Sequence, residues 1–313
     1  MATDIHAHVW TDDYLDLLQG FGKTDTDTQR GLGAGASDAE MEARFALMDQ
    51  AGIPRQVISV PPQSPHFADE GHAVRAARAA NDLYAEVVRR WPDRFRAFAA
   101  LPFPHVDAVL AELARCLDEL GMVGAATTTS ILGRTIADPV FAPVLDELDR
   151  RGSVLYIHPA GVGAESALIA DHHLTWMIGA PIEDTVSVMH LILAGIPSRY
   201  PRLRIVNSHL GGALPMVLAR ADHQYGWEAP DTPEKPSVAA RRMWYDTVGH
   251  GHVPALIAAV ESLGADRLLL GTDFPYQAGE QFLDASGYIR HSGLPGDQVT
   301  AILDSNAQRV ITW

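Results

Sequence analysis

The sequence predicts an α/β protein, a single-domain (β/α)8 TIM barrel that spans residues 1–313. Eight apolar, β-rich segments are each followed by a segment with helical periodicity. This alternation implies parallel strands joined by right-handed crossovers. Eight such units in a chain of 313 residues, with no linker between them, favour a closed barrel. An open, doubly wound sheet remains the alternative.

The expected strands and helices alternate along the whole chain. The strands are Ala2–Val9, Gln56–Pro61, Phe95–Leu101, Met122–Thr128, Val154–His158, Leu203–His209, Met243–Val248 and Arg267–Asp273. The helices are Asp38–Ala51, Gly71–Arg90, Asp107–Gly121, one from Asp138-Pro139 to Gly152, Asp171–Gly195 in two pieces broken near Gly179–Pro181, Ala213–Tyr225, Val253–Leu263 and the region Asp284–Ile311. The polar, Gly-rich segment between Trp10 and Ser37 fits neither pattern, and we expect a long loop there.

Residue chemistry supports several of these boundaries. Gly52 and Gly152 are suited to end the preceding helices as C-caps. Pro139 stands in a first-turn position, where a helix tolerates proline. Cys116 lies on a helix with a leucine stripe, so we expect it to be a packing residue rather than a nucleophile.

Composition narrows the class of partner. The chain has 24 basic and 39 acidic residues, a formal net charge of -15, which argues against nucleic-acid and anionic-membrane partners. No apolar run is long enough to suggest a membrane span, and we expect no signal peptide. With Cys116 as the only cysteine, no intramolecular disulfide can form, so a reducing cytoplasm fits.

Histidines and a carboxylate recur at the ends of the expected strands. His6 and His8 share one face of the first strand, because side chains alternate with period two, and Asp4 is expected on that face too. Other strands end in His158, in His209 and in Asp273. In a TIM barrel these ends meet on one rim, where active sites are built. A lone histidine at a strand end is more often structural, but five such residues together predict a metal site.

This order of ligands resembles the amidohydrolase superfamily. Further motifs are similar to the branch that contains aminocarboxymuconate-semialdehyde decarboxylase and the resorcylate-type decarboxylases. They are Asp4-Ile-His-Ala-His8, Met48-Asp-Gln-Ala-Gly-Ile, Asn81-Asp-Leu, Leu155-Tyr-Ile-His-Pro159, Trp176-Met-Ile-Gly-Ala-Pro181, Ser208-His-Leu-Gly-Gly212 and Gly271-Thr-Asp-Phe-Pro275. The resemblance runs nearly end to end, and it implies a TIM-barrel enzyme that acts on a small carboxylic acid.

The resemblance also implies how the metal is held. Binuclear members of the superfamily carry a bridging Lys or Glu on strand four, and Met122–Thr128 has neither, so one divalent metal per chain is expected. The implied metal ligands are His6, His8, His158 and Asp273, with His209 as an acid-base residue outside the ligand set. Zn2+ is the first choice for three imidazoles and one carboxylate, and Mn2+ is the second.

Three further residues are candidates for substrate binding or support, and each has an ordinary structural explanation. Trp176 stands where related decarboxylases place an aromatic over the substrate, although helix packing explains it equally well. Arg220 matches an arginine that reaches the substrate of a neighbouring subunit in a homodimer, and an intrachain ion pair is the alternative. Asp4 either hydrogen-bonds to a ligand imidazole or joins a buried polar network. Asp246 is expected to be structural.

The leading hypothesis is a metal-dependent, non-oxidative decarboxylase of a small aromatic or conjugated carboxylic acid. His209 and Asp273 would move the proton that the reaction needs. The alternative is a hydrolase of an amide, lactone or C–C bond that uses a metal-bound hydroxide. A barrel without activity is a third reading, against which the intact ligand set argues. The substrate itself does not transfer, because the substrate-binding arginine of the semialdehyde decarboxylase lies on an insertion after strand one. The only arginine in this loop is Arg30.

Overall fold

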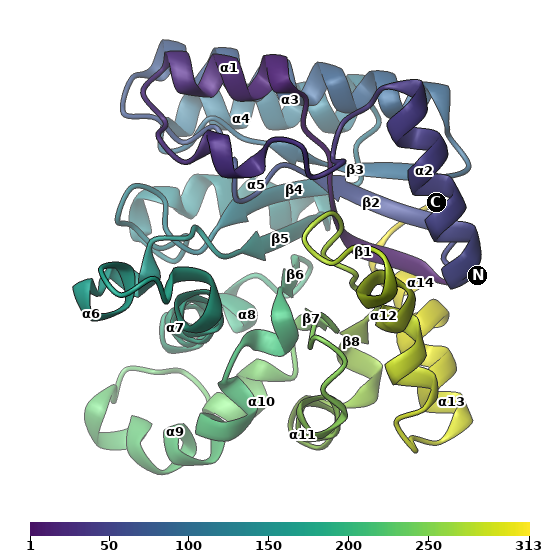
Figure 1. The fold of residues 1–313 in the computed structure, drawn as a ribbon. Coiled ribbons are helices and arrows are strands. Elements are labelled where there is room, and N and C mark those ends of the chain that lie inside the picture. Colours follow the sequence, from purple (N-terminus) through teal and green to yellow (C-terminus); the bar gives the residue numbers. More distant parts are fainter.

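Eight parallel strands form one sheet in the order β1 to β8, and helices surround it (Figure 1). The computed structural model describes residues 1–313. The strands are β1 Thr3–His8, β2 Arg55–Ser59, β3 Phe95–Ala100, β4 Gly124–Thr128, β5 Val154–His158, β6 Arg204–Asn207, β7 Trp244–Asp246 and β8 Leu268–Leu269. All eight predicted strands are confirmed, and the predicted TIM barrel with them.

The sheet closes between β8 and β1. Ile5 N donates to Leu270 O at 2.9 Å, and an isolated parallel bridge pairs Ala7 with Phe274. Asp273 N then donates to His6 O at 2.8 Å, so the end of β8 is tied directly to the candidate metal-binding strand. This closure removes the open edge of the doubly wound alternative.

The helices follow the strands in the expected alternation. They are α1 Asp12–Gly20, α2 Asp38–Ala51, α3 Glu70–Arg90, α4 Val106–Ala114, α5 Ala142–Arg151, α6 Ala167–Ala170, α7 Ala180–Leu193, α8 Ile196–Arg199, α9 Leu214–Glu228, α10 Pro236–Ala240, α11 Val253–Leu263, α12 Glu280–Arg290, α13 Gly296–Thr300 and α14 Asn306–Val310. Gly52 and Gly152 end α2 and α5 with left-handed φ angles of 67° and 59°, as predicted. No helix has both the length and the hydrophobicity needed to cross a membrane.

Two predictions of local structure are wrong. The segment after β1 is not a loop throughout, because α1 lies in it. Thr11 caps this helix by accepting a hydrogen bond from Tyr14 N at 3.3 Å, and Tyr14, Leu15 and Leu18 bury its apolar face. The helical region Asp171–Gly195 is not broken near Gly179–Pro181; the break lies earlier, between the end of α6 at Ala170 and Thr175. A π-helical turn, Thr175–Gly179, runs into α7 with right-handed backbone at Gly179.

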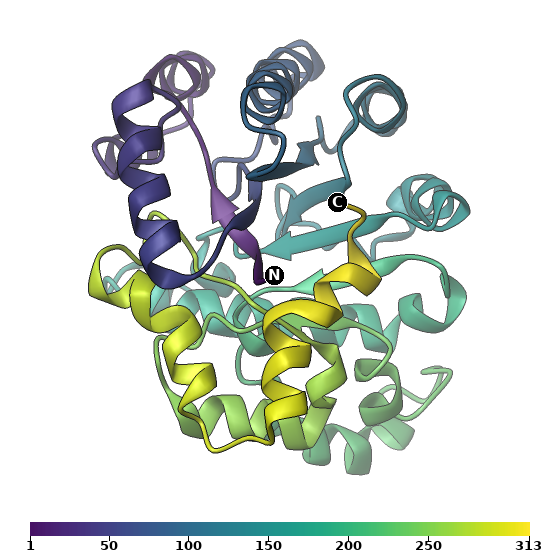
Figure 2. The same ribbon diagram turned by 90° about the vertical axis from the view of Figure 1, so that its right-hand side faces the viewer.

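The core has two parts. A cluster of 61 buried residues packs between the sheet and the helices, and it includes Cys116 as predicted. A second cluster of 12 takes at least one side chain from every strand, which places it inside the barrel. Its members are Ile5, Val57, Phe98, Ala126, Val154, Tyr156, Val206, Trp244, Leu269, Ala307, Val310 and Ile311. The C-terminal segment thus plugs the end of the barrel at which both termini lie (Figure 2).

Candidate metal centre and acid-base pair

Four of the predicted residues converge at the carboxyl ends of β1, β5 and β8. The side-chain ligand atoms of His6, His8, His158 and Asp273 lie within 4.8 Å of one another, and all four residues are buried. His6 Nε2 is 3.2 Å from His8 Nε2 and 3.1 Å from Asp273 Oδ1. His8 Nε2 is 3.2 Å from the same carboxylate oxygen. Three imidazole nitrogens and one carboxylate oxygen form a donor set that suits Zn2+ or Mn2+.

Neighbouring acceptors fix which nitrogen of the His158 and His6 rings faces the cluster. His158 Nδ1 donates to the carbonyl of Pro159 at 2.9 Å, because a carbonyl oxygen can only accept. His158 Nε2 is then a buried nitrogen with no partner in the protein, as expected of an atom that holds a metal. His6 Nδ1 lies 2.8 Å from Asp246 Oδ2, and this carboxylate orients the ring as partners of metal-binding histidines do.

Backbone strain marks the same rim. Asp273 and His209 have φ angles of 60° and 51°, a left-handed region that residues other than glycine rarely adopt. Such conformations persist where the surrounding structure fixes them, and they concentrate at functional sites.

His209 stands beside the four-residue cluster rather than in it. Its Nδ1 lies 2.9 Å from Asp184 Oδ2, and its Nε2 lies 3.8 Å from Asp273 Oδ2. Burial alone would lower the pKa of His209, but the Asp184 and Asp273 carboxylates outweigh it and hold this pKa well above its usual value. A histidine paired with a carboxylate, and facing a candidate metal ligand, is arranged to carry a proton.

Asp184 and Asp246 are the functional residues that the sequence analysis missed. Asp184 on α7 holds His209 and also accepts from Ser208 Oγ at 2.8 Å. Asp246 holds the His6 ring and accepts from the backbone N–H of His209 at 2.9 Å. Asp246 could have been found, because it is a carboxylate at the carboxyl end of a barrel strand. Asp184 lies on a helix, where the strand-end rule gives no signal.

The predicted placement of Asp4 is wrong. Ile5 packs in the inner cluster, and the pairing register shifts between Asp4 and Ala7, so Asp4 does not share the face of His6. Its carboxylate accepts from Gln56 Nε2 at 2.8 Å, and Gln56 Oε1 in turn accepts from Arg44 Nε on α2 at 2.7 Å. Asp4 touches His6 only through the backbone N–H, at 3.0 Å. It belongs to a buried polar network, and Asp246 is the partner of the imidazole.

The two candidates for substrate contact lie at the surface. Trp176, 48% exposed, stands in the π-helical turn before α7, close to Gly161 in the loop after β5; a Cβ on that glycine would lie 2.7 Å from the indole ring. Arg220 is exposed on α9 and makes no ion pair within the chain, so the intrachain ion pair is not observed. His172, His173, His250 and His252 are exposed.

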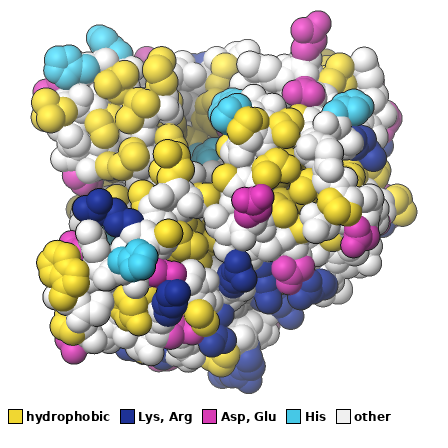
Figure 3. All heavy atoms as spheres, turned by 90° about the horizontal axis from the view of Figure 1, so that it is seen from below, with side chains coloured by type: hydrophobic (Ala, Val, Ile, Leu, Met, Phe, Trp, Pro, Cys, Tyr) yellow, Lys and Arg dark blue, Asp and Glu magenta, His cyan; other side chains and the backbone are white.

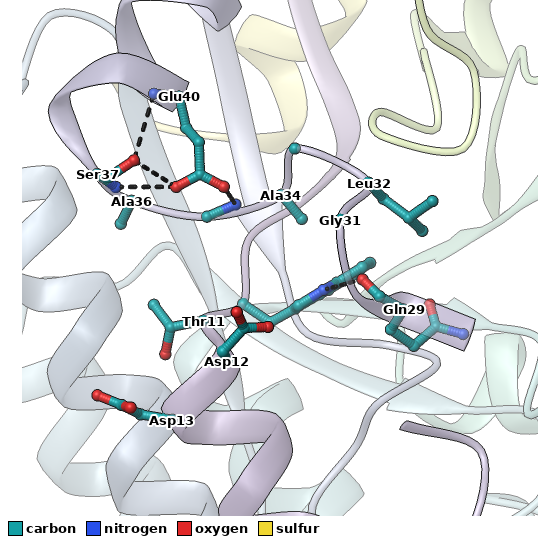
Figure 4. A pocket seen from close by; sticks show the side chains of 13 residues that line it. Thr11, Asp12, Asp13, Gln29, Gly31, Leu32, Ala34, Ala36, Ser37 and Glu40 are labelled. Atoms are coloured by element: carbon teal, nitrogen blue, oxygen red, sulfur yellow. Dashed lines mark hydrogen bonds between the residues drawn. The ribbon is translucent and has the colours of Figure 1, made fainter. Parts of the chain in front are cut away.

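A pocket of about 320 Å³ opens beside the site, between the start of α1 and the loop before α2 (Figure 4). Trp10 lines it and also packs on the His8 ring, with the ring centroids 5.8 Å apart. Trp10 Nε1 donates to Gln29 O at 3.1 Å, and Glu40 accepts from Gly35 N at 3.2 Å. The Trp10 side chain therefore lies between this pocket and the His8 ring of the candidate metal centre.

Fold and site together define a class: a barrel with a four-residue candidate metal site on its carboxyl rim and an adjacent histidine–carboxylate pair. The sequence matches the Amidohydrolase family over residues 3–312, and the chain belongs to that family. The superfamily expected from the motifs is thus confirmed.

Relatives narrow the comparison to decarboxylases. The chain is 32% identical over 289 residues to gamma-resorcylate decarboxylase of Rhizobium sp. (strain MTP-10005), with 86% of each chain covered. It is 29% identical over 245 residues to 2-amino-3-carboxymuconate-6-semialdehyde decarboxylase of Dictyostelium discoideum, covering 76% of this chain and 67% of that one. A crystal structure of dihydroxybenzoic acid decarboxylase from Polaromonas sp. JS666, with bound manganese and the inhibitor 2-nitroresorcinol, superposes with a TM-score of 0.85. That pair is 28% identical, with 99% and 96% of the two chains covered.

Proposed function

We propose that this protein is a metal-dependent, non-oxidative decarboxylase of a small aromatic carboxylic acid. The observation that carries the proposal is the four-residue cluster with the His209–Asp184 pair beside it, in a chain related over most of its length to gamma-resorcylate decarboxylase. The same barrel and 28% identity are shared with a dihydroxybenzoic acid decarboxylase that binds manganese.

His6, His8, His158 and Asp273 would hold the metal. When bound, a divalent ion supplies positive charge that can orient the carboxylate of the acid and a neighbouring oxygen. We propose one ion per chain, with Zn2+ as the first candidate from the donor set and Mn2+ as the second.

The acid-base work falls to His209. Decarboxylation of an aromatic acid requires a proton at the ring carbon that bears the carboxylate; the C–C bond then breaks, its electron pair returns to the ring and CO2 leaves. His209 Nδ1 is held by Asp184, so Nε2 is the atom that can hold and deliver a proton on the side of Asp273. Asp273 would assist in moving this proton as well as binding the metal.

Substrate contact and assembly extend the proposal. Trp176 would cover the aromatic ring of the acid at the rim. Exposed apolar side chains gather around it, among them Leu168 and Met177 at 78% and 74% exposure. Hydrophobic side chains also lie on both sides of a hollow in the face seen in Figure 3. We propose a homodimer in which the unpaired Arg220 of one protomer reaches the substrate of its partner.

Domain organisation and location complete the proposal. We propose that residues 1–313 act as one domain. The lone, buried Cys116 is compatible with the cytoplasmic location that we propose.

The test is a product assay. Protein loaded with Zn2+ or Mn2+ is incubated with hydroxybenzoates that carry one or two hydroxyl groups beside the carboxylate, and with a matched panel of amides and lactones. We expect CO2 and the corresponding phenol from the hydroxybenzoates. Hydrolysis of an amide or lactone with no CO2 from any acid would replace the decarboxylase by the hydrolase alternative.

A further inference from the structure

The loop after β5 has an unusual backbone conformation that needs support from other residues. It follows the candidate ligand His158 and runs from Pro159 to Glu165. Gly161, Gly163, Ala164 and Glu165 have φ angles of 76°, 61°, 52° and 58°. Two of these residues carry a Cβ, and such residues rarely remain left-handed unless their surroundings fix them.

Glu183, in the first turn of α7, fixes this loop with one carboxylate. Oε2 accepts from Ala160 N at 2.7 Å and from Gly161 N at 3.2 Å. Oε1 accepts from Val162 N at 2.9 Å and from Ala164 N at 3.4 Å. The Thr129 hydroxyl, at the end of β4, donates to Oε2 at 2.8 Å. Successive backbone N–H groups turned to one centre form an anion-binding nest, and here the anion is a side chain of the same protein.

Both oxygens of the Glu183 carboxylate are satisfied by these hydrogen bonds. Glu183 is 3% exposed, so water does not compete for it, and hydrogen bonds to an ionised acceptor are stronger than neutral ones. None of its hydrogen bonds goes to a residue of the metal cluster, and neither the acid-base pair nor the ligand set includes it.

The loop that Glu183 holds is the one that orients His158. The first carbonyl of the loop, that of Pro159, accepts from His158 Nδ1 at 2.9 Å, which keeps Nε2 unprotonated and directed away from the loop. Thr129, which bonds to Glu183 through its hydroxyl, also donates its backbone N–H to His158 O at 2.8 Å. Both supports of His158 are therefore connected to the same carboxylate.

We propose that Glu183 is a positioning residue for the metal centre: its carboxylate organises the 160–164 backbone nest and thereby fixes the ring of His158 for metal binding. This inference rests on the proposed metal site. The effect of Glu183 is expected only at the end of β5. The β6 side has its own contacts from α7, because Asp184 reaches His209 and Thr185 accepts from Ala213 N at 2.7 Å.

The test compares Glu183→Gln with Glu165→Gln. An amide keeps the shape but turns one acceptor oxygen into an N–H2 donor that faces N–H donors, so the nest loses at least one pair of bonds. Glu165 is an exposed acid in the same loop whose side chain accepts only from Ser130 Oγ, at 3.3 Å, and it serves as the matched control. We expect the dissociation constant for Mn2+, titrated by the electron paramagnetic resonance of the free ion, to rise about 10- to 100-fold in Glu183→Gln, the scale typical of residues that support metal ligands. In Glu165→Gln it stays at the wild-type value.

Chemical rescue separates positioning from general damage. Glu183→Ala removes the carboxylate but keeps the backbone N–H groups of the loop as donors, so added formate should bind to them, restore the nest and recover part of the lost Mn2+ affinity. Formate has no such effect on the wild type or on Glu165→Gln. A loss of affinity in Glu183→Ala that formate leaves unchanged would reduce Glu183 to a general structural residue and overturn the proposal.

If the Glu183 variants do not fold, a milder variant tests whether the contacts of Glu183 affect Mn2+ affinity. Thr129→Val keeps volume and removes one donor to Glu183, and a smaller rise of the Mn2+ dissociation constant is expected. Unchanged Mn2+ affinity in this variant, or in a folded Glu183→Gln, would overturn the inference while leaving the metal site intact. Wild-type protein that binds no divalent ion would overturn the proposed function and this inference together.

Discussion

The two halves of the candidate metal centre are held in different ways. On the side of β1 and β8, the support lies inside the sheet. Asp4 accepts hydrogen bonds from the backbone N–H groups of His6 and Thr272, both at 3.0 Å, and so joins the two strands at the closure of the barrel. Asp246, at the end of β7, holds the ring of His6 at 2.8 Å.

On the side of β5 and β6, the sheet contributes the bond from His209 N to Asp246, and further support comes from a helix outside the sheet. Three consecutive residues in the first turns of α7 reach three different segments. Glu183 holds the loop after His158, Asp184 holds the ring of His209, and Thr185 holds the backbone at Ala213. Gly212 allows this contact, since a Cβ there would lie 2.0 Å from the carbonyl oxygen of Pro181.

Because of this difference, we expect substitutions on the two sides to affect different properties, the stability of the barrel on one side and the function of the site on the other. Substitutions on the β1–β8 side break contacts between strands and should weaken the barrel itself. Substitutions on the β5–β6 side loosen a helix-to-loop contact and should change metal affinity or proton transfer with less cost to folding. Variants on the two sides should therefore differ in which property they lose.

The largest effect is expected for His158→Ala. It removes a candidate ligand from the helix-held half, and the three remaining residues hold the ion poorly, so metal and activity should be lost together. Elemental analysis and CO2 release on the same preparation provide the measurement. Full metal content in this variant would show that His158 is not a ligand.

His209→Ala should separate the two functions of the same half. Because His209 is outside the cluster, metal content is expected to persist, while turnover falls by about two to four orders of magnitude, the usual scale for a positioned acid-base group. Loss of metal would instead make His209 a ligand. Unchanged turnover would make it structural.

Asp184→Asn and Asp4→Asn compare the two supports directly. Asp184→Asn should keep the metal and lower turnover about 10- to 100-fold, because the amide no longer stabilises a charged His209 ring. Asp4→Asn should leave turnover near the wild-type value at moderate temperature. It should reduce the free energy of unfolding by about 1–3 kcal/mol, because each Asp4 oxygen accepts from two donors and one such pair loses its acceptor. Urea denaturation and steady-state kinetics of both variants are the measurements. The same loss of stability in both would remove the distinction between the halves.

Features that depend on local sequence could be predicted, and features that depend on contacts between distant segments could not. The eight strands and the convergence of His6, His8, His158 and Asp273 were predictable, because alternation and strand ends are local features of the chain. α1 was missed although Thr11 and the acidic first turn signal a helix start, since the composition of the segment suggested a loop. The face of Asp4 was misplaced because a register shift in β1 breaks the two-residue period. Glu183 and Asp184 could not be placed, because their partners lie on loops that only the folded chain brings together.

The smallest predicted effect is the number of protons released when the metal binds. This number depends on which of the three imidazoles is charged in the metal-free protein. Burial lowers the pKa of His6, but the neighbouring Asp246 and Asp273 carboxylates outweigh it and raise this pKa to about 9. Burial lowers the pKa of His8 to about 4 and that of His158 well below its usual value. A metal binds neutral imidazole, so at about pH 6 uptake should displace about one proton, from His6 alone.

Well below pH 6 His8 would add a proton, and as the pH rises through the pKa of His6 the proton that this imidazole contributes should fall toward zero. At about pH 6 a zinc-bound water contributes little, because its ionisation lies near neutral pH. Titration calorimetry in two buffers of different ionisation enthalpy gives the count. Release of two or three protons at about pH 6 would mean that His8 or His158 is charged in the metal-free protein. The carboxylates would then dominate burial at every ring, and the contrast between a charged ligand held by Asp246 and neutral ligands held by burial would be lost.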